Sequence, residues 1–369
     1  MINWFKKYTL YIMLILACIL SAFIAFIYIN KWLATPVEPV GMVPGQEELA
    51  LSSGDISPSP DAEKEEAQKQ EPETKVLCPL DGASLKELPA RRPLAVMIDN
   101  HSRAHPQSGL READLVYEML VEGGITRLMA VYYHNSAEKI GPIRSARPYF
   151  IDRALDHNAI YVHVGQSPQA QTYFQEKKPA HLDEYSITKG FWRTDDREPP
   201  HNLYTSTDNL WQLASDYNLN QQVDLEGFLF GTEENVFNGD REAEEIVIFY
   251  PQQFSQVRYV YDPDSRRYRR FMGGKAHIDA ETNLQLSASN VIVQFVNTKT
   301  IDGVGRLEMD MIGEGKALVF SRGMVKEVRW KKQKLKEATR YLDSEDREVV
   351  LEPGQTWIEV VPRDIRIDY

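Results

Sequence analysis

RPLAVMIDN (92–100), DLVYEML (114–120) and ITRLMAVYYH (125–134) are three apolar runs that follow one another closely in the chain. Each run is rich in Val, Ile, Leu, Met or Tyr, and residues that favour turns, such as Pro106 and Gly123, lie between them. This pattern predicts neighbouring strands of one sheet. Charged side chains gather at the predicted strand ends, where functional groups tend to collect on a rigid scaffold.

Helix and strand signals alternate through the first half of the folded part. Helices are predicted at Pro148–Asp156 and from Ser167 to about Glu176, with a buried strand at Ala159–Val164 between them. Serine followed by proline is a strong helix start, because serine caps free amides and proline tolerates the first turn. Another helix is predicted to begin at Ser206, Thr207 or Asp208. We therefore expect an α/β domain over residues 76–240.

The second half has a different pattern. From Glu245 to Val361, short runs of alternating apolar and polar residues are separated by turn signals such as DPDS, GG and SRG. Such runs predict short antiparallel strands. The expected fold class is α+β, in which a mostly antiparallel β domain over residues 241–369 follows the α/β domain.

The N-terminus carries a candidate membrane anchor. Residues 8–29 form a run of 22 residues without a charge, enough to cross a hydrocarbon core of about 30 Å. Lys6 and Lys7 precede it, so residues 1–7 are expected to stay cytoplasmic and the remainder to be extracytoplasmic. A cleaved signal peptide, or a lipoprotein signal ending at Cys18, are the alternatives.

The amino-acid composition excludes several classes of function. The formal net charge is −12, and no block has the net basic charge that binding a nucleic acid backbone requires. Residues 30–75 are rich in Pro, Ser, Glu and Gln, which predicts a disordered acidic linker. The two cysteines, Cys18 and Cys78, rule out a four-cysteine zinc site, and a disulfide between the two is implausible because Cys18 lies inside the apolar run. No cofactor is predicted.

A compact cationic element lies in GPIRSARPY (141–149). Arg144 and Arg147 flank Ser145, and guanidinium groups can grip a carboxylate or phosphate by paired hydrogen bonds. The proposed ligand site also contains Arg127. Glu118 and Glu122 would orient these arginines. The alternative, equally weighted, is that the arginines form structural salt bridges with those glutamates or with Asp152.

Ser167, His201 and Asn202 complete the candidate site. Ser167 follows a predicted strand in GQSPQA, which faintly resembles a nucleophile elbow but better fits a helix cap and a place for an anion. His201 in PPHNLYTS is a candidate general base, with Asn202 as an amide neighbour. His201 and Ser167 are the only catalytic candidates, and no triad order is evident.

Two further patterns have structural alternatives. Asp99, His101 and His105 have a spacing that could bind zinc or manganese, although a surface loop is the favoured interpretation. An aromatic sugar platform could also form in the second half, but its positions in alternating strands favour a place in the core. The platform residues would be Trp330, Trp357 and Tyr341.

Ordered motifs connect this chain with a known family. They are VMIDN, PQSGL with ADLVYE, EGGITR, GPIRSARPYF, YVHVG with SPQA, PHNLYTS, NVIVQ and PGQTWIEVVP. With them the region 78–362 resembles the YerB-like family of bacterial lipoproteins, a family of uncharacterised function found mainly in Gram-positive bacteria. The resemblance implies a surface-anchored ectodomain with an N-terminal and a C-terminal part.

This chain departs from the family pattern in three places. ILAC (15–18) is a weaker lipidation box than the family's lipoproteins have, which favours a transmembrane anchor. His105 stands where the family often has arginine, which weakens it as a metal ligand, and Gln166 stands where a glycine is expected.

The expected function is that of a membrane-anchored binding or scaffold protein of the bacterial cell envelope. Its partner would be an anionic wall polymer or an envelope protein, bound through the arginines. The alternative is an envelope hydrolase or transferase acting on glycan, peptide or phosphodiester, with His201 as the base. The sequence leaves open whether the protein is an enzyme.

Overall fold

The computed structural model describes residues 75–232 and 235–369, which belong to one compact unit. The fold is mixed, with two large sheets and three helices among the described residues. None of these helices is both long and apolar enough to cross a membrane. The predicted anchor at residues 8–29, the cytoplasmic tail at residues 1–7 and all of the linker before residue 75 lie outside the described residues.

The central sheet has eleven strands. Five come from the first half: β3 (Leu94–Asp99), β4 (Leu115–Leu120), β5 (Thr126–Tyr132), β6 (Ile160–His163) and β7 (His181–Asp183). Six come from the second: β11 (Arg241–Glu242), β17 (Asn290–Val296), β20 (Gly313–Ser321), β21 (Met324–Lys332), β22 (Arg340–Leu342) and β24 (Thr356–Pro362). The strand order is β11-β21-β20-β17-β24-β4-β5-β3-β6-β7, and β22 pairs with β21.

The predicted boundary near residue 240 does not interrupt this sheet. β24 pairs in parallel with β17 on one side and with β4 on the other, where Trp357 lies opposite Val116 and Glu359 opposite Glu118. Every residue of β3, β4 and β5 is buried, which explains their nearly continuous apolar sequences. The two halves of the chain therefore build one sheet.

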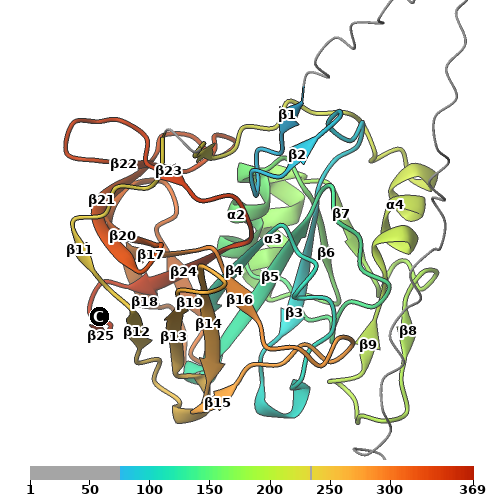
Figure 1. Cartoon of the computed structure of the whole chain (residues 1–369). Coiled ribbons are helices and arrows are strands. Elements are labelled where there is room, and N and C mark those ends of the chain that lie inside the picture. The colour runs from blue at the N-terminus through green and yellow to red at the C-terminus, as the bar shows by residue number, and fades with distance from the viewer. Residues whose placement is uncertain (1–74, 233–234) are drawn as a thin grey trace, which may run out of the picture. The chain divides into compact units, whose positions relative to one another are not determined.

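A second sheet is antiparallel throughout and packs near β4 and β24 (Figure 1). It consists of β12 (Glu245–Ile248), β13 (Val257–Asp262), β14 (Arg267–Met272), β15 (Lys275–Ala276), β16 (Ser287–Ala288) and β25 (Ile367–Asp368). Its contact with the central sheet includes charged groups, because Arg270 of β14 pairs with both Glu118 and Glu359. All three side chains are fully buried.

The three helices begin where the sequence predicts. They are α2 (Pro148–Asp156), α3 (Pro168–Lys177) and α4 (Thr207–Asp216). Ser167 accepts a hydrogen bond from the Ala170 amide, and Ser206 accepts one from the Asn209 amide, so both serines are N-caps. Figure 1 shows α2 and α3 side by side, while α4 lies apart from them and contacts β3.

Short elements complete the described structure. The small strands are β1 (Val76–Leu77), β2 (Ser84–Leu85), β8 (Trp192–Arg193), β9 (Leu203–Tyr204), β10 (Leu229–Phe230), β18 (Thr298–Thr300), β19 (Leu307–Met309) and β23 (Val350–Leu351). Single turns of 3-10 helix cover Ser102–Ala104, Glu122–Gly124 and Gln253–Ser255.

The aromatic residues of the second half lie in the core. Trp330, Trp357 and Tyr341 are 2%, 0% and 4% exposed, so they offer no platform to a sugar. The Trp330 indole donates a hydrogen bond to the Phe295 carbonyl, and the Tyr341 hydroxyl donates one to Gln294. The core interpretation of these three residues is confirmed.

Candidate anion-binding site

Asp99, the last residue of β3, is the centre of a charged cluster. Its Oδ2 atom accepts a hydrogen bond of 2.6 Å from His201 Nδ1 and lies 3.0 Å from Arg144 Nε. Its Oδ1 atom accepts a hydrogen bond of 3.0 Å from the His101 amide. Both oxygens are therefore held, and the carboxylate is almost fully buried.

The backbone explains how these residues meet. The segment after Gly141 runs beside the end of β3: the Asp99 amide donates to the Pro142 carbonyl, and the Arg144 amide donates to the Met97 carbonyl. The Ile143 amide in turn donates to the Leu203 carbonyl, which brings the segment containing His201 alongside. Three distant parts of the chain thus converge on one carboxylate.

The contact with Asp99 determines the tautomer of the neutral His201 ring. Because Nδ1 donates to the carboxylate, the neutral ring carries its free lone pair on Nε2. The ring of His101 stacks on it with centroids 5.1 Å apart. A histidine oriented by a carboxylate in this way can accept a proton, or can donate one when charged.

A second group of contacts joins Arg127 and Arg147 through Ser145. Arg127, opposite Asp99 in the β3–β5 pairing, donates to the Ser145 carbonyl at 2.8 Å and to its hydroxyl at 3.3 Å. Arg147 donates to the same hydroxyl at 3.1 Å. It also donates to both carboxylate oxygens of Glu122, at 2.8 and 2.7 Å. Ser145 therefore lies between two guanidinium groups.

The cluster has an excess of positive charge. Arg144 pairs with Asp99 and Arg147 with Glu122, but no ion pair within the described ranges includes Arg127. Burial, together with the charge of Arg147, lowers the pKa of Arg127 to about 10, so its guanidinium stays charged at neutral pH. Burial would raise the pKa of Glu122, but Arg147 outweighs it and the pKa is lowered. Three cations thus face two anions.

Two of the predicted ligand residues lie elsewhere or act differently. Glu118 does not reach the arginines of this cluster, because it is buried in β4 against Arg270, Asn100 and Thr126. Asn202 donates to the Thr194 carbonyl and accepts from Arg193, so its amide joins β8 to the segment before β9. Glu122 does orient one of the three predicted arginines, Arg147.

The backbone of Ser167 lies next to the arginine segment, but in the described structure the Ser167 side chain makes no hydrogen bond to His201. Its hydroxyl caps α3 through the Ala170 amide at 3.1 Å, and its own amide donates to the Ala146 carbonyl at 3.3 Å. No hydrogen bond in the described part of the chain joins Ser167 to His201. The α3 N-terminus therefore lies next to the arginine segment, where its free amides favour an anion.

The metal candidates Asp99, His101 and His105 do not converge on one point. His101 Nδ1 accepts from the Arg103 amide, whereas His105 Nε2 contacts Asn100 Oδ1 at 2.9 Å. Within the described residues, the group that gathers metal-ligand atoms is a different one: Cys78, Asp81, Asp114 and His134. Its sequence signal was a cysteine and an aspartate three residues apart, with polar residues at the ends of two buried strands.

The comparisons with known proteins agree with this architecture. Models for the N-terminal and C-terminal domains of a protein of unknown function (DUF3048) match residues 81–220 and 246–358. The "Putative lipoprotein YerB" of Bacillus subtilis is 33% identical over 293 residues, which cover 78% of this chain and 87% of that protein. This chain belongs to the YerB-like family. The resemblance inferred from the ordered motifs is confirmed.

A solved structure extends the likeness to three dimensions. The crystal structure of YerB protein from Bacillus subtilis superimposes with a TM-score of 0.71 at 32% sequence identity, covering 80% of this chain and all of that one. The mixed fold is thus a property shared with a YerB-like relative.

Proposed function

We propose that this YerB-like protein is an extracytoplasmic binding protein of the bacterial cell envelope, anchored by residues 8–29, that captures an anionic group with Arg127, Arg144 and Arg147. The lipoprotein name of its relative supports a membrane-associated location. The observation that carries the ligand class is the charge excess: Arg127 is buried without an ion-pair partner among the described residues, beside two arginines that each already pair with a carboxylate.

An anion would complete this arrangement. Guanidinium groups bind phosphate and carboxylate through paired, charge-assisted hydrogen bonds, which are stronger than those between neutral groups. The side chains of Arg144 and Arg147 are 22% and 13% exposed, so both are reachable from solvent. Wall polymers with phosphodiester groups and acidic segments of envelope proteins both present suitable groups.

The test is sedimentation of the chain from residue 76 onward with purified cell walls, prepared with and without their phosphate-containing polymer. Arg144→Ala/Arg147→Ala is expected to weaken binding about 10-fold or more, which corresponds to about 1.4 kcal/mol. Binding by the wild-type protein should also weaken as salt rises, because charges are screened beyond about 8 Å at physiological ionic strength.

Arg329→Ala is the matched control, because Arg329 is an ion-paired arginine far along the chain whose carboxylate partners lie at the surface. It should leave wall binding unchanged. The proposal would be overturned if wall binding by the wild-type protein did not change with salt concentration and the double substitution left binding unchanged. Binding that survives removal of the phosphate polymer but still needs the arginines would direct the search to a protein partner.

The Asp99–His201 contact favours a second candidate, an envelope hydrolase or transferase. With the ring oriented by Asp99, His201 could activate a water molecule or a substrate hydroxyl, and the arginines could stabilise developing negative charge. Ser167 is less suited to be the nucleophile, because its hydroxyl serves the helix cap. Release of soluble wall fragments by the wild-type protein, lost in His201→Gln, would establish this alternative. Binding without any release would favour the first proposal.

A further inference from the structure

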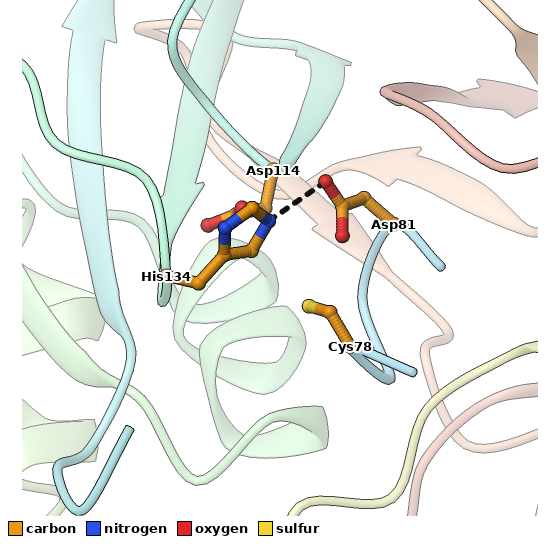
Figure 2. Close-up of side chains that lie close together, drawn as sticks. All are labelled: Cys78, Asp81, Asp114 and His134. Carbon is orange, nitrogen blue, oxygen red and sulfur yellow. Dashed lines mark hydrogen bonds and ion pairs between the residues drawn. The ribbon is translucent and has the colours of Figure 1, made fainter. Parts of the chain in front are cut away.

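Four side chains with metal-binding atoms meet at the start of the folded unit (Figure 2). Cys78 and Asp81 lie in the turn between β1 and β2, Asp114 immediately precedes β4, and His134 follows β5. Figure 2 shows the Cys78 sulfur and the Asp81 carboxylate directed towards the His134 ring. Three separate segments therefore supply one cluster.

The distances suit a single metal ion. His134 Nε2 lies 2.9 Å from Asp81 Oδ2 and 2.8 Å from Asp114 Oδ1. One ligand atom from each of the four residues lies within 4.8 Å of all the others. In a tetrahedral zinc site with bonds of roughly 2.0 to 2.3 Å, the ligand atoms are roughly 3.3 to 3.7 Å apart. Small side-chain movements would give that spacing.

The types of ligand favour zinc. A thiolate, an imidazole and two carboxylates are all zinc ligands, whereas calcium and magnesium prefer oxygen alone. The cluster is also buried: Cys78 is 0% and Asp81 6% exposed, and Asp114 is 0% exposed. Buried carboxylates are costly unless a cation compensates them. A divalent ion would supply that charge.

Other contacts hold the ligands in place. Asp81 Oδ1 accepts from the Ala83 amide, and Asp114 Oδ2 accepts from the Tyr133 amide. Asp114 Oδ1 additionally accepts from the side chain of Asn135. Each carboxylate is therefore fixed by a backbone amide on one oxygen while its other oxygen faces His134. Such outer contacts are what orients the ligands of a metal site.

Without a metal, the same cluster would need a proton on His134. Hydrogen bonds to Asp114, Asp81 and Cys78 raise the pKa of His134 to about 12, while burial raises the pKa of the Cys78 thiol. A protonated imidazole between two carboxylates is thus the competing arrangement. The two states differ in a measurable way, because only the metal-bound state makes a sulfur–metal bond.

We propose that Cys78, Asp81, Asp114 and His134 form a structural Zn²⁺ site. Four protein ligands leave no open position for a substrate, as is typical of structural zinc. The ion would fasten the β1–β2 hairpin, which has only two residue pairs, to the ends of β4 and β5. That hairpin is the first described element of the chain, so the site would fix the start of the folded unit to the central sheet.

The test uses the full chain purified in detergent, stripped with a chelator and then supplied with either Zn²⁺ or Co²⁺. One zinc ion per chain is expected to remain after desalting, and the melting temperature should rise with bound metal. The cobalt form should show the near-ultraviolet charge-transfer absorption of a cobalt–thiolate bond. Cys78→Ser should abolish this absorption.

Cys18→Ser is the matched control, because Cys18 is the other cysteine of the chain and lies far from the cluster in sequence. It should keep both the bound zinc and the cobalt absorption. His134→Gln provides a second variant if Cys78→Ser fails to fold, and it should also lose zinc. A wild-type protein that retains no zinc, or a cobalt form without thiolate absorption, would overturn the proposal.

Discussion

Glu118 shows how burial, together with the charge of the neighbouring Glu359, can change the charge state of a residue. Its carboxylate contacts Arg270, Thr126 and Asn100, yet complete burial raises its pKa to about 8. The folded state therefore holds this proton over a pH range in which the unfolded chain releases it. The associated stability is fully present below about pH 4.5 and is lost as the pH rises through about 8.

Glu118→Gln is expected to flatten this dependence, since glutamine has a similar shape and does not titrate. The free energy of unfolding, measured by urea titration at several pH values, should differ in slope between about pH 5 and 8, with the wild type losing on the order of 1 kcal/mol more per pH unit than the variant. Glu122→Gln is the control and should keep the wild-type slope; an equal slope in Glu118→Gln would refute the assignment.

At the scale of elements, the second sheet meets the central sheet through Arg270 of β14. Its guanidinium pairs with Glu118 of β4 and Glu359 of β24, donates to His277 Nδ1 at 3.0 Å and lies 4.2 Å from the centre of the Trp357 ring. The charged groups compensate one another only as long as the two sheets stay packed. Removing the arginine would leave the buried Glu359 carboxylate without its cation and the buried Glu118 carboxyl without the hydrogen bond that Arg270 donates to it.

Arg270→Met should therefore destabilise the protein by about 3–5 kcal/mol in urea unfolding. Its neighbour Arg269 gives a matched control, because that side chain is 55% exposed and pairs with Asp262 at the surface. Arg269→Met should cost less than about 1 kcal/mol. Equal losses of unfolding free energy in the two variants would show that the buried contact of Arg270 stabilises the protein no more than the surface contact of Arg269.

At the scale of the whole molecule, the central sheet depends on both halves of the chain. β24 lies between β17 and β4, so residues 76–240 alone would expose the edge of β4 and leave Glu118 without Arg270. An exposed edge with buried apolar strands behind it favours aggregation.

Residues 76–240 produced alone are expected to be unfolded or aggregated, and co-production with residues 241–369 should restore a soluble complex. Circular dichroism and size-exclusion chromatography distinguish these outcomes. A monomeric, cooperatively melting 76–240 fragment would instead show that the first half is an independent domain.

Local chemistry made several features predictable from the sequence. The caps at Ser167 and Ser206 and the start of α2 at Pro148 depend on a few neighbouring residues, and the structure has all three. The runs that became β3 and β4 are apolar because both of their faces are buried. The ordered motifs also identified the family. Likewise, Arg144 and Arg147 were recognisable because they lie close together in one segment.

Pairings between distant residues required the tertiary structure. His201 meets Asp99 across 102 positions, and Arg270 meets Glu118 across 152. The sequence also did not predict which strand lies beside β4. The alternation of apolar and polar residues indicates which face of a strand is buried, but it does not indicate which strand is its neighbour. The sequence by itself thus determined the local elements, the family and the cationic segment. Only the tertiary structure decided the partners of each charge. Ion pairs, neighbouring strands and clusters of ligand atoms bring together segments that are far apart in the chain, and the spacing of those segments in the sequence does not predict that they meet.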